Sequence, residues 1–297
     1  MEKPCILNLK IACLLRFSVF WIIPMVAKSC HSALEGIDVH YWEGGTGFPI
    51  LMLHGVGPGT SIIGNFEPTI GPLMERYHIL ASDLIGFGDS GRKSDQPYFD
   101  VELWIRQGIA LLDLLPPGQC GIAGHSMGGA LALKIAAASD RVTHVLTSST
   151  VGTCYPITHA LDAFWSLPDD KKKLRTVMAD MVGKPTAITD AMIEGRWELL
   201  SQDGYAEYFG EMFAAPRQRY IDAGRVTDYE CRKLNMRGVN ISMLHGNDDK
   251  PCPAGLTTIE LAKQLPEATV TLIEGCGHNL PREATTEYLE AAHNLFG

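Results

Sequence analysis

Short apolar runs alternate with longer amphipathic stretches along most of the chain. The predicted strands are residues 37–42, 49–53, 78–82, 120–123, 142–148, 240–244 and 269–273. Helices are predicted over residues 101–115, where Pro116 ends the pattern, and over residues 129–138. Strands that alternate with helices in this way are typical of an α/β protein with a mostly parallel, twisted sheet and helices on both of its faces.

The strand pattern stops between residues 155 and 234. This segment contains helical patterns that are interrupted by Pro168, Pro185 and Pro216. A connection of this length is not a bare loop in a compact domain. We therefore predict an α/β core formed by residues 31–154 and 235–297, with residues 155–234 inserted as a helical cap. Such caps shield a site from water and shape its pocket.

The first thirty residues allow three interpretations. Residues 11–27 are almost continuously apolar, which suggests a membrane anchor, but the run is short and Arg16 would be costly in hydrocarbon. A secretory signal is the second interpretation, although Met25 fits a cleavage site poorly. In the third, Met25 is the true start. We treat residues 1–30 as an apolar N-terminal extension and expect a cytoplasmic protein, unless residues 11–27 export it or anchor it to a membrane.

Composition narrows the classes of partner. The formal net charge is -9, and no stretch gathers lysine and arginine into a stripe, so a nucleic-acid partner is not expected. The eight cysteines form no C-x-x-C pair, which argues against a zinc ribbon or a thioredoxin-type motif and favours reduced thiols. We find no metal-ligand cluster and no dinucleotide fingerprint. We therefore expect a small-molecule substrate, no metal and no cofactor, and leave a homo-oligomer open.

The sharpest chemical signal is the sequence Gly124-His125-Ser126-Met127-Gly128, which lies between a predicted strand and a predicted helix. This is the G-x-S-x-G nucleophile elbow in the context that the motif requires. The glycines allow the strand and the helix to approach each other closely around a strained serine. Ser126 is therefore the candidate nucleophile, and the Met127 amide is a candidate oxyanion donor.

A serine hydroxyl needs a base, and the base needs an acid that orients it. His278 follows the last predicted strand, where a loop can return to the elbow, and it is the candidate base. Asp249 follows the strand at residues 240–244 and is the preferred acid, with Asp248 as the alternative. The order Ser126, Asp249, His278 is the one expected for this fold. His54 and His245 each precede a glycine at a strand end, and we expect structural, hydrogen-bonded roles for both.

The second oxyanion donor should come from the loop that follows residue 53. This loop reads His54-Gly55-Val56-Gly57-Pro58-Gly59, and its glycines suit a backbone that approaches a ligand. We assign the donor to the amide of Val56. His125 should point away from Ser126 and form a wall of the pocket.

Over about residues 34–297 the chain resembles the α/β-hydrolase superfamily. Within it, the nearest resemblance is to the meta-cleavage product hydrolases, which cut a carbon–carbon bond in ring-opened, carboxylate-bearing dienones formed from catechols. Three segments carry this resemblance: Gly57-Pro58-Gly59 followed by Asn65-Phe66, Asp83-Leu84-Ile85-Gly86-Phe87-Gly88, and Gly195-Arg196-Trp197-Glu198.

The resemblance implies substrate-binding roles for Asn65, His125, Arg196, Trp197 and Asn279. Arg196 would pair with the carboxylate or the developing enolate of the substrate, a task suited to a planar fork of donors. Without the resemblance, Arg196 is only an arginine of a cap helix.

The chain departs from the family pattern at two positions. The family usually has asparagine before the nucleophile, where this chain has His125. It usually has tryptophan after the catalytic histidine, where this chain has Asn279. A carboxylesterase that uses the same triad is therefore the alternative function. The third is a ligand receptor that keeps the fold and signals through the cap.

Overall fold

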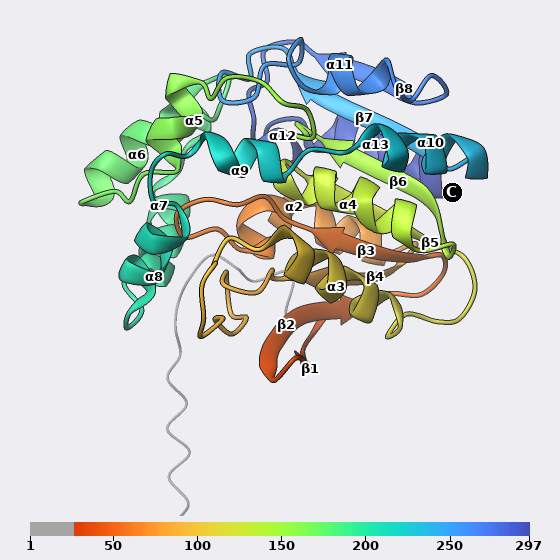
Figure 1. Ribbon diagram of the computed structural model, residues 1–297, viewed down its shortest axis with the longest axis horizontal. Coiled ribbons are helices and arrows are strands. Elements are labelled where there is room, and N and C mark those ends of the chain that lie inside the picture. Colours follow the sequence, from red (N-terminus) through yellow and green to blue (C-terminus); the bar gives the residue numbers. More distant parts are fainter. Residues whose placement is uncertain (1–26) are drawn as a thin grey trace, which may run out of the picture.

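The computed structural model describes residues 27–297, so residues 1–26, which include Arg16, Met25 and nearly all of the apolar run, lie outside it. An eight-stranded sheet with the order β1-β2-β4-β3-β5-β6-β7-β8 forms the centre of the molecule (Figure 1). All neighbouring strands from β4 onward in this order pair in parallel. The strands are β1 Ala27–Leu34, β2 Ile37–Gly44, β3 Pro49–Leu53, β4 His78–Ser82, β5 Cys120–His125, β6 Val142–Ser148, β7 Asn240–Gly246 and β8 Thr269–Ile273.

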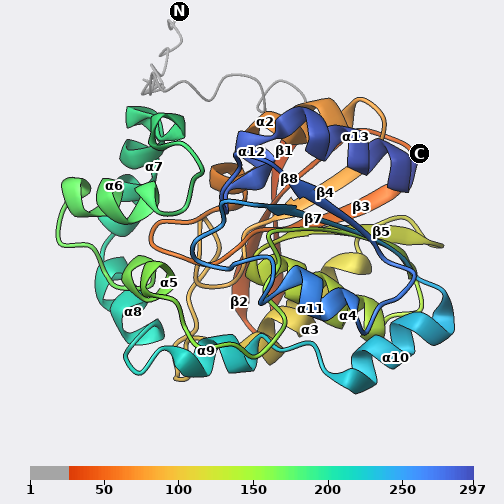
Figure 2. The ribbon, with the colours of Figure 1, turned by 90° about the horizontal axis from the view of Figure 1, so that it is seen from above.

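Helices cover both faces of the sheet (Figure 2). One face is covered by α2 (Ile62–Met74), α12 (Leu280–Glu283) and α13 (Thr285–Phe296), and the other by α3 (Val101–Leu112), α4 (Met127–Ala138), α10 (Asp228–Arg237) and α11 (Thr258–Ala262). Successive residues of a strand point to opposite faces, so β3 supplies Ile50 and Met52 to one core and Leu51 and Leu53 to the other. The predicted fold class is confirmed.

Strand β1 was not predicted. It pairs antiparallel with β2 along its whole length, from Ala27 opposite Gly44 to Leu34 opposite Ile37. Most of its residues are exposed or half-buried, so it lacks the apolar run by which the other strands were recognised. The strand begins before residue 31, and the expected boundary between extension and core therefore falls inside β1.

Five short helices lie together beyond one end of the sheet, between β6 and α10 (Figures 1 and 2). They are α5 His159–Phe164, α6 Lys171–Ala179, α7 Asp190–Leu200, α8 Tyr205–Met212 and α9 Gln218–Ala223. We call residues 155–223 the helical roof. Helix α10 packs against α4 on the sheet instead, so the range 155–234 that was expected for the cap includes most of a core helix.

The parallel strands all run toward the roof, and the loops that carry the candidate site residues leave β3, β5, β7 and β8 at that edge. This placement is the usual one for a site in an open α/β sheet. Within residues 27–297, no helix combines the length and the apolar character needed to cross a bilayer.

Candidate active site

Ser126 occupies a strained turn between β5 and α4. Its φ of 55° and ψ of -120° lie outside the regions that residues with a Cβ ordinarily adopt. A Cβ on Gly124 would lie 2.1 Å from the carbonyl oxygen of Gly128, and one on Gly128 would lie 2.3 Å from that of Leu53. Both glycines are therefore required by the close approach of strand and helix, as the motif predicts.

The three candidate triad residues meet beneath the roof. His278 Nε2 lies 2.9 Å from Ser126 Oγ, and His278 Nδ1 lies 2.7 Å from Asp249 Oδ2. All three side chains are buried. Asp248, the alternative acid, is exposed, and its amide donates to the carbonyl of Cys276. The geometry of a proton relay from serine to histidine is thus present with Asp249 as its third member.

The electrostatics of this group favour a charged pair. Burial disfavours the imidazolium of His278, but the Asp249 carboxylate outweighs it and holds the pKa of His278 well above its ordinary value. Burial likewise disfavours the Asp249 anion, yet His278 and His245 lower the pKa of Asp249 below its usual range. Asp249 therefore stays ionised and can stabilise a proton on His278.

Asp249 also has contacts that the sequence did not indicate. Its Oδ1 accepts a hydrogen bond from the Cys252 amide at 2.8 Å, and its Oδ2 lies 3.0 Å from Nε2 of His245. His245 is fully buried and its Nδ1 lies 2.7 Å from Thr258 Oγ1. His245 is hydrogen-bonded as expected, but its neighbour is Asp249, the candidate acid of the triad.

The loop after β3 brings the second candidate oxyanion donor to the nucleophile. A Cβ on Gly55 would lie 2.8 Å from the Cβ of Ser126, so this backbone passes directly over the serine. The Gly55 amide donates to Asn65 Oδ1 at 2.9 Å, which fixes the loop. Among the residues that the structure describes, no group accepts a hydrogen bond from the amides of Val56 or Met127. Both amides are therefore free to donate to a developing oxyanion.

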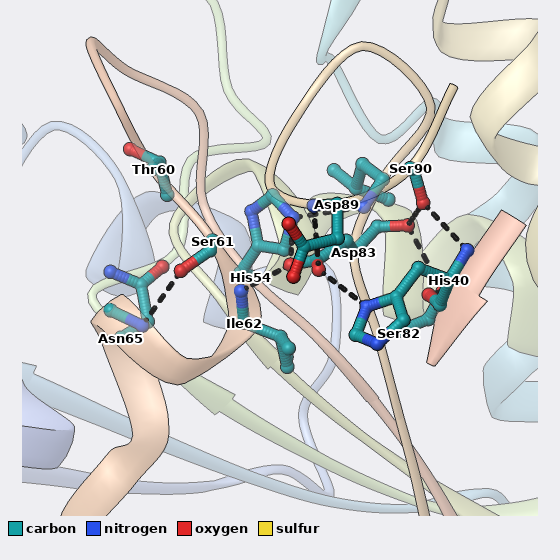
Figure 3. A network of polar contacts seen from close by, with 12 residues as sticks. His40, His54, Thr60, Ser61, Ile62, Asn65, Ser82, Asp83, Asp89 and Ser90 are labelled. Atoms are coloured by element: carbon teal, nitrogen blue, oxygen red, sulfur yellow. Dashed lines mark hydrogen bonds and ion pairs between the residues drawn. The ribbon is translucent and has the colours of Figure 1, made fainter. Parts of the chain in front are cut away.

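A buried polar network supports this loop from the core side (Figure 3). Asp83 Oδ1 accepts from the Ile62 amide at 2.7 Å, and Asp83 Oδ2 lies 2.8 Å from Nδ1 of His40 and accepts from the Asp89 amide at 3.2 Å. Asp83 thus ties the start of α2, and with it the end of the oxyanion loop, to the strands β2 and β4.

His54 completes the support at the start of the loop. Its Nε2 accepts from the Leu84 amide at 2.9 Å, so Nδ1 carries the proton and donates to the Gly55 carbonyl at 2.6 Å. Burial lowers the pKa of His54, which agrees with a neutral ring. The expected structural role of His54 matches these contacts.

A cavity under the roof brings Ser126 and His278 together with side chains from the cap. The volume of this cavity, counting the open space at its mouth, is about 390 Å³. Its polar lining includes Ser126, His278 and the candidate substrate residues Asn65, His125, Arg196 and Asn279. Its apolar lining comes from Val56 and from the roof, which supplies Phe164, Met178, Met181 and Val182. Four of the five predicted substrate-binding residues therefore share one cavity with the serine.

Trp197 is the exception. It does not line the cavity but packs, half-buried, against the larger hydrophobic core. Neighbouring residues of a helix point about 100° apart, so Arg196 and Trp197 cannot both face the same space. The expectation that Trp197 binds substrate is therefore not met by its position.

Arg196 is a buried cation that lines the same cavity as Ser126. Its Nη1 donates to the Pro58 carbonyl at 2.7 Å and to Thr60 Oγ1 at 2.9 Å, and the guanidinium lies 5.9 Å from the ring centre of Phe164. Burial lowers the pKa of Arg196 to about 10, so it remains protonated at neutral pH. Within residues 27–297 no carboxylate pairs with it. An anionic ligand would supply the missing countercharge.

His125 and Asn279 both line the cavity beside His278, the candidate base. His125 Nδ1 lies 3.1 Å from the Ser148 carbonyl, which only accepts, so Nδ1 carries the proton and Nε2 is left as an acceptor. Burial, followed by the charge of His278, holds the pKa of His125 well below its ordinary value. The backbone N–H of Asn279 donates to the Met181 carbonyl and to the Glu283 carboxylate. The residue also lines the cavity.

Two groups of residues have ligand atoms close enough to hold a metal ion: Asp249, Cys252 and His278, and His40, Asp83 and Asp89. The buried carboxylates of both groups already accept hydrogen bonds from backbone N–H groups and contact histidines. These contacts account for the positions of both carboxylates. The six cysteines of the described residues are free thiols.

The family model for the alpha/beta hydrolase fold matches residues 49–284, and the chain belongs to this family. The chain is 30% identical over 244 residues to a 2-hydroxymuconate semialdehyde hydrolase of a Pseudomonas species, a match that covers 82% of this chain and 84% of that protein. It is also 30% identical to a 2-hydroxy-6-oxo-2,4-heptadienoate hydrolase of Pseudomonas putida, over 88% of this chain and 93% of that protein.

A solved structure supports the same relationship. The meta-cleavage product hydrolase from Pseudomonas fluorescens superposes with a TM-score of 0.82 at 28% identity, covering 91% of this chain and 98% of that chain. The protein is therefore an enzyme, an α/β-hydrolase whose relatives are meta-cleavage product hydrolases. The resemblance inferred from the sequence is confirmed.

Proposed function

We propose that the enzyme hydrolyses a carbon–carbon bond in a 2-hydroxy-6-oxo-2,4-dienoate, with Ser126 as nucleophile, His278 as base and Asp249 as the acid that orients the base. The observation that carries this proposal is that Ser126 and His278, hydrogen-bonded to each other, line one buried cavity with Arg196, a cation that no carboxylate of residues 27–297 pairs with. A carboxylate at one end of the substrate and a ketone toward the other would match these two groups.

Arg196 would bind the substrate carboxylate and the oxygen on the adjacent carbon. Its Nη1 is occupied by Pro58 and Thr60, so the remaining guanidinium donors are the ones that would meet the ligand. A cation beside the 2-hydroxyl group favours its ionised form. Loss of that proton to the solvent, followed by protonation at C5, gives the 2,6-dioxo tautomer whose C5–C6 bond can break.

Ser126 Oγ then attacks the C6 carbonyl carbon while its proton passes to His278 Nε2. The amides of Val56 and Met127 would hold the resulting oxyanion. The C5–C6 bond breaks, its electron pair moves to the C2 oxygen as a dienolate, and the proton on His278 neutralises that dienolate. Water, activated by His278, hydrolyses the acyl-serine ester, releases a carboxylic acid and restores the Ser126 hydroxyl.

We propose a small group at C6. The relatives at 30% identity that are described above are named for substrates with an aldehyde or a methyl ketone there. The side chains that would surround this group in the present cavity are bulky and apolar, and Phe164 and Met181 come from the roof. In this proposal the loops that follow the strands supply the catalytic groups, and the roof, including Arg196, recognises the substrate.

A carboxylesterase is the second candidate, because His125 and Asn279 stand where the meta-cleavage product hydrolases usually have asparagine and tryptophan. The test compares the bleaching of yellow 2-hydroxy-6-oxo-2,4-heptadienoate with the hydrolysis of short p-nitrophenyl esters by the same preparation. We expect many turnovers on the dienoate and a kcat/KM far above that on the esters. Efficient ester hydrolysis without bleaching would establish the esterase, and a single slow turnover on both would indicate a receptor.

A further inference from the structure

A second histidine lies against the carboxylate of the catalytic acid. Asp249 Oδ2 is 2.7 Å from Nδ1 of His278 on one side and 3.0 Å from Nε2 of His245 on the other. The side chains of Asp249 and His245 are both inaccessible to solvent. One carboxylate oxygen is therefore placed between two imidazoles in a medium where water cannot screen the contact.

The neighbours of His245 fix which of its nitrogens carries the proton. Nε2 lies 2.8 Å from the Cys252 carbonyl oxygen and 3.0 Å from Asp249 Oδ2, and both of these oxygens only accept. Nε2 must therefore be protonated. Nδ1 faces the Thr258 hydroxyl at 2.7 Å, which can donate to it. A neutral His245 with the proton on Nε2 satisfies every one of these contacts.

The Nε2–H of His245 is hydrogen-bonded to the Cys252 carbonyl and lies beside the Asp249 carboxylate, so it contacts two parts of the Asp249 turn. The Cys252 amide donates to Asp249 Oδ1, and the carbonyl of Cys252 faces His245 Nε2. His245 thus contacts both the carboxylate and the residue whose amide binds the other carboxylate oxygen. Rotation of the Asp249 side chain away from His278 would break contacts on both of its oxygens.

We infer that His245 is a positioning residue for the proposed hydrolysis: its Nε2–H, hydrogen-bonded to the Cys252 carbonyl and 3.0 Å from Asp249 Oδ2, fixes the turn that holds Asp249 toward His278 and withdraws part of the negative charge of the carboxylate. This inference rests on the proposed triad. It has a consequence for the base, because a carboxylate that is partly neutralised by a second donor stabilises the imidazolium less. Loss of the donor from position 245 would therefore make His278 a stronger base and its protonated form more persistent.

Other titratable groups also lie around Asp249 and His278, and the His245 substitutions leave these groups unchanged. The thiol of Cys252 lies near His278 and accepts a hydrogen bond from the Tyr155 hydroxyl at 3.3 Å. The titratable groups around Asp249 and His278 are His125, Tyr155, His245, Cys252 and Glu283.

Two amide substitutions distinguish the loss of the Nε2–H donor of His245 from the loss of its imidazole ring. In His245→Gln the amide nitrogen reaches about the position of Nε2, so the donor to Asp249 is kept. In His245→Asn the shorter amide reaches only the position of Nδ1, facing Thr258, and the donor is lost. The readout is the pH dependence of Ser126 labelling by a fluorophosphonate, which reports the free base whatever the natural substrate is.

We expect His245→Asn to move the acid limb of the labelling rate upward by about half a pH unit, the scale of one hydrogen bond, and so to slow labelling by about threefold on that limb. His245→Gln should leave the limb where the unsubstituted enzyme has it. Equal limbs in all three proteins, or equal shifts in both variants, would overturn the inference. Failure of the unsubstituted enzyme to react with the probe would instead refute the proposed triad.

A measurement on the unsubstituted enzyme covers the case in which His245→Asn does not fold. Nitrogen-15 NMR of the histidine-labelled protein distinguishes the two neutral tautomers. We expect His245 to keep its proton on Nε2 across the pH range in which His278 titrates. A proton on Nδ1 would contradict the inference, because Nε2 could then donate neither to Asp249 nor to Cys252.

Discussion

The imidazole rings of His125 and His278 lie 5.1 Å apart, centre to centre, at an angle of 55°. Two buried cations at this separation would repel each other strongly. The surroundings of the two rings favour a proton on His278 and a neutral His125. His125 donates toward the Ser148 carbonyl and is neutral, whereas Asp249 favours the charged form of His278. The neutral ring can therefore form a wall of the cavity without competing for the proton of Ser126.

The pH profile follows from this division. Burial opposes protonation of His278, but Asp249 raises its pKa above the ordinary histidine value of about 6.5. His278 must be neutral to accept the serine proton, so activity is lost as the pH falls through this raised pKa. We expect kcat/KM for the dienoate to rise with pH along a limb whose midpoint lies above 6.5. A midpoint at or below 6.5, measured with initial rates over pH 5 to 9, would contradict this expectation.

Replacement of the nucleophile tests the site directly. Ser126→Ala should reduce turnover about a millionfold, because neither the base nor the oxyanion donors can act without it. The elbow should persist, since alanine keeps the Cβ and the glycines that shape the turn are unchanged. The melting temperature and the binding of the dienoate, followed by its absorbance, should therefore be close to those of the unsubstituted enzyme. Substantial turnover in this variant would place the nucleophile elsewhere.

Arg196 should discriminate between anionic and neutral substrates. Arg196→Gln removes a charged partner of the carboxylate and should lower kcat/KM for the dienoate roughly tenfold to a hundredfold. Neutral esters should lose far less. Arg175→Gln is the matched control, because Arg175 lies in the same roof but pairs at the surface with Asp190. Equal losses on acids and esters in Arg196→Gln would mean that Arg196 only supports the oxyanion loop.

The network below the oxyanion loop should contribute both stability and rate. Asp83→Asn leaves buried donors poorly matched and should lower the free energy of unfolding by about 3 kcal/mol. The loop that carries Val56 loses part of its support, so kcat should fall as well, by about tenfold. Urea denaturation and initial rates measure the two effects. Asp95→Asn, on the exposed surface nearby, should change neither, and an unaltered Asp83→Asn enzyme would show that the network is dispensable.

Most of the sheet was predictable because buried parallel strands read as apolar runs. The predicted strands at 49–53, 78–82 and 142–148 have the bounds that the structure shows, and so does the strand at 269–273, although most of its residues are exposed. The strand that was not predicted is β1, whose residues are partly exposed to solvent and do not form an apolar run. Helix α2 was also not predicted. It contains Pro68 and Pro72, which local propensity counts against a helix, and it is held by the Ser61 cap and by a buried face.

The triad could be proposed from the sequence because each member follows a strand and the carboxyl ends of parallel strands meet at one edge. The contact between His245 and Asp249 could not, because the direction of a buried side chain depends on packing. The same limit explains Trp197. Its place beside Arg196 in the sequence suggested a shared role, but the turn of the helix sends the two side chains to different environments.

The roof and the oxyanion loop are fastened together at three points. Arg196 bonds to Pro58 and Thr60, and the indole of Trp165 donates to the Val56 carbonyl at 3.2 Å. These hydrogen bonds couple the position of the roof to that of the loop that carries Val56. If the roof lifts to release product, it must either break these three hydrogen bonds or move the loop that carries Val56 relative to Ser126. Opening of the cavity to bulk water and weakening of the proposed oxyanion site would then be coupled, so the opened enzyme would react more slowly with esters from solution than the closed one.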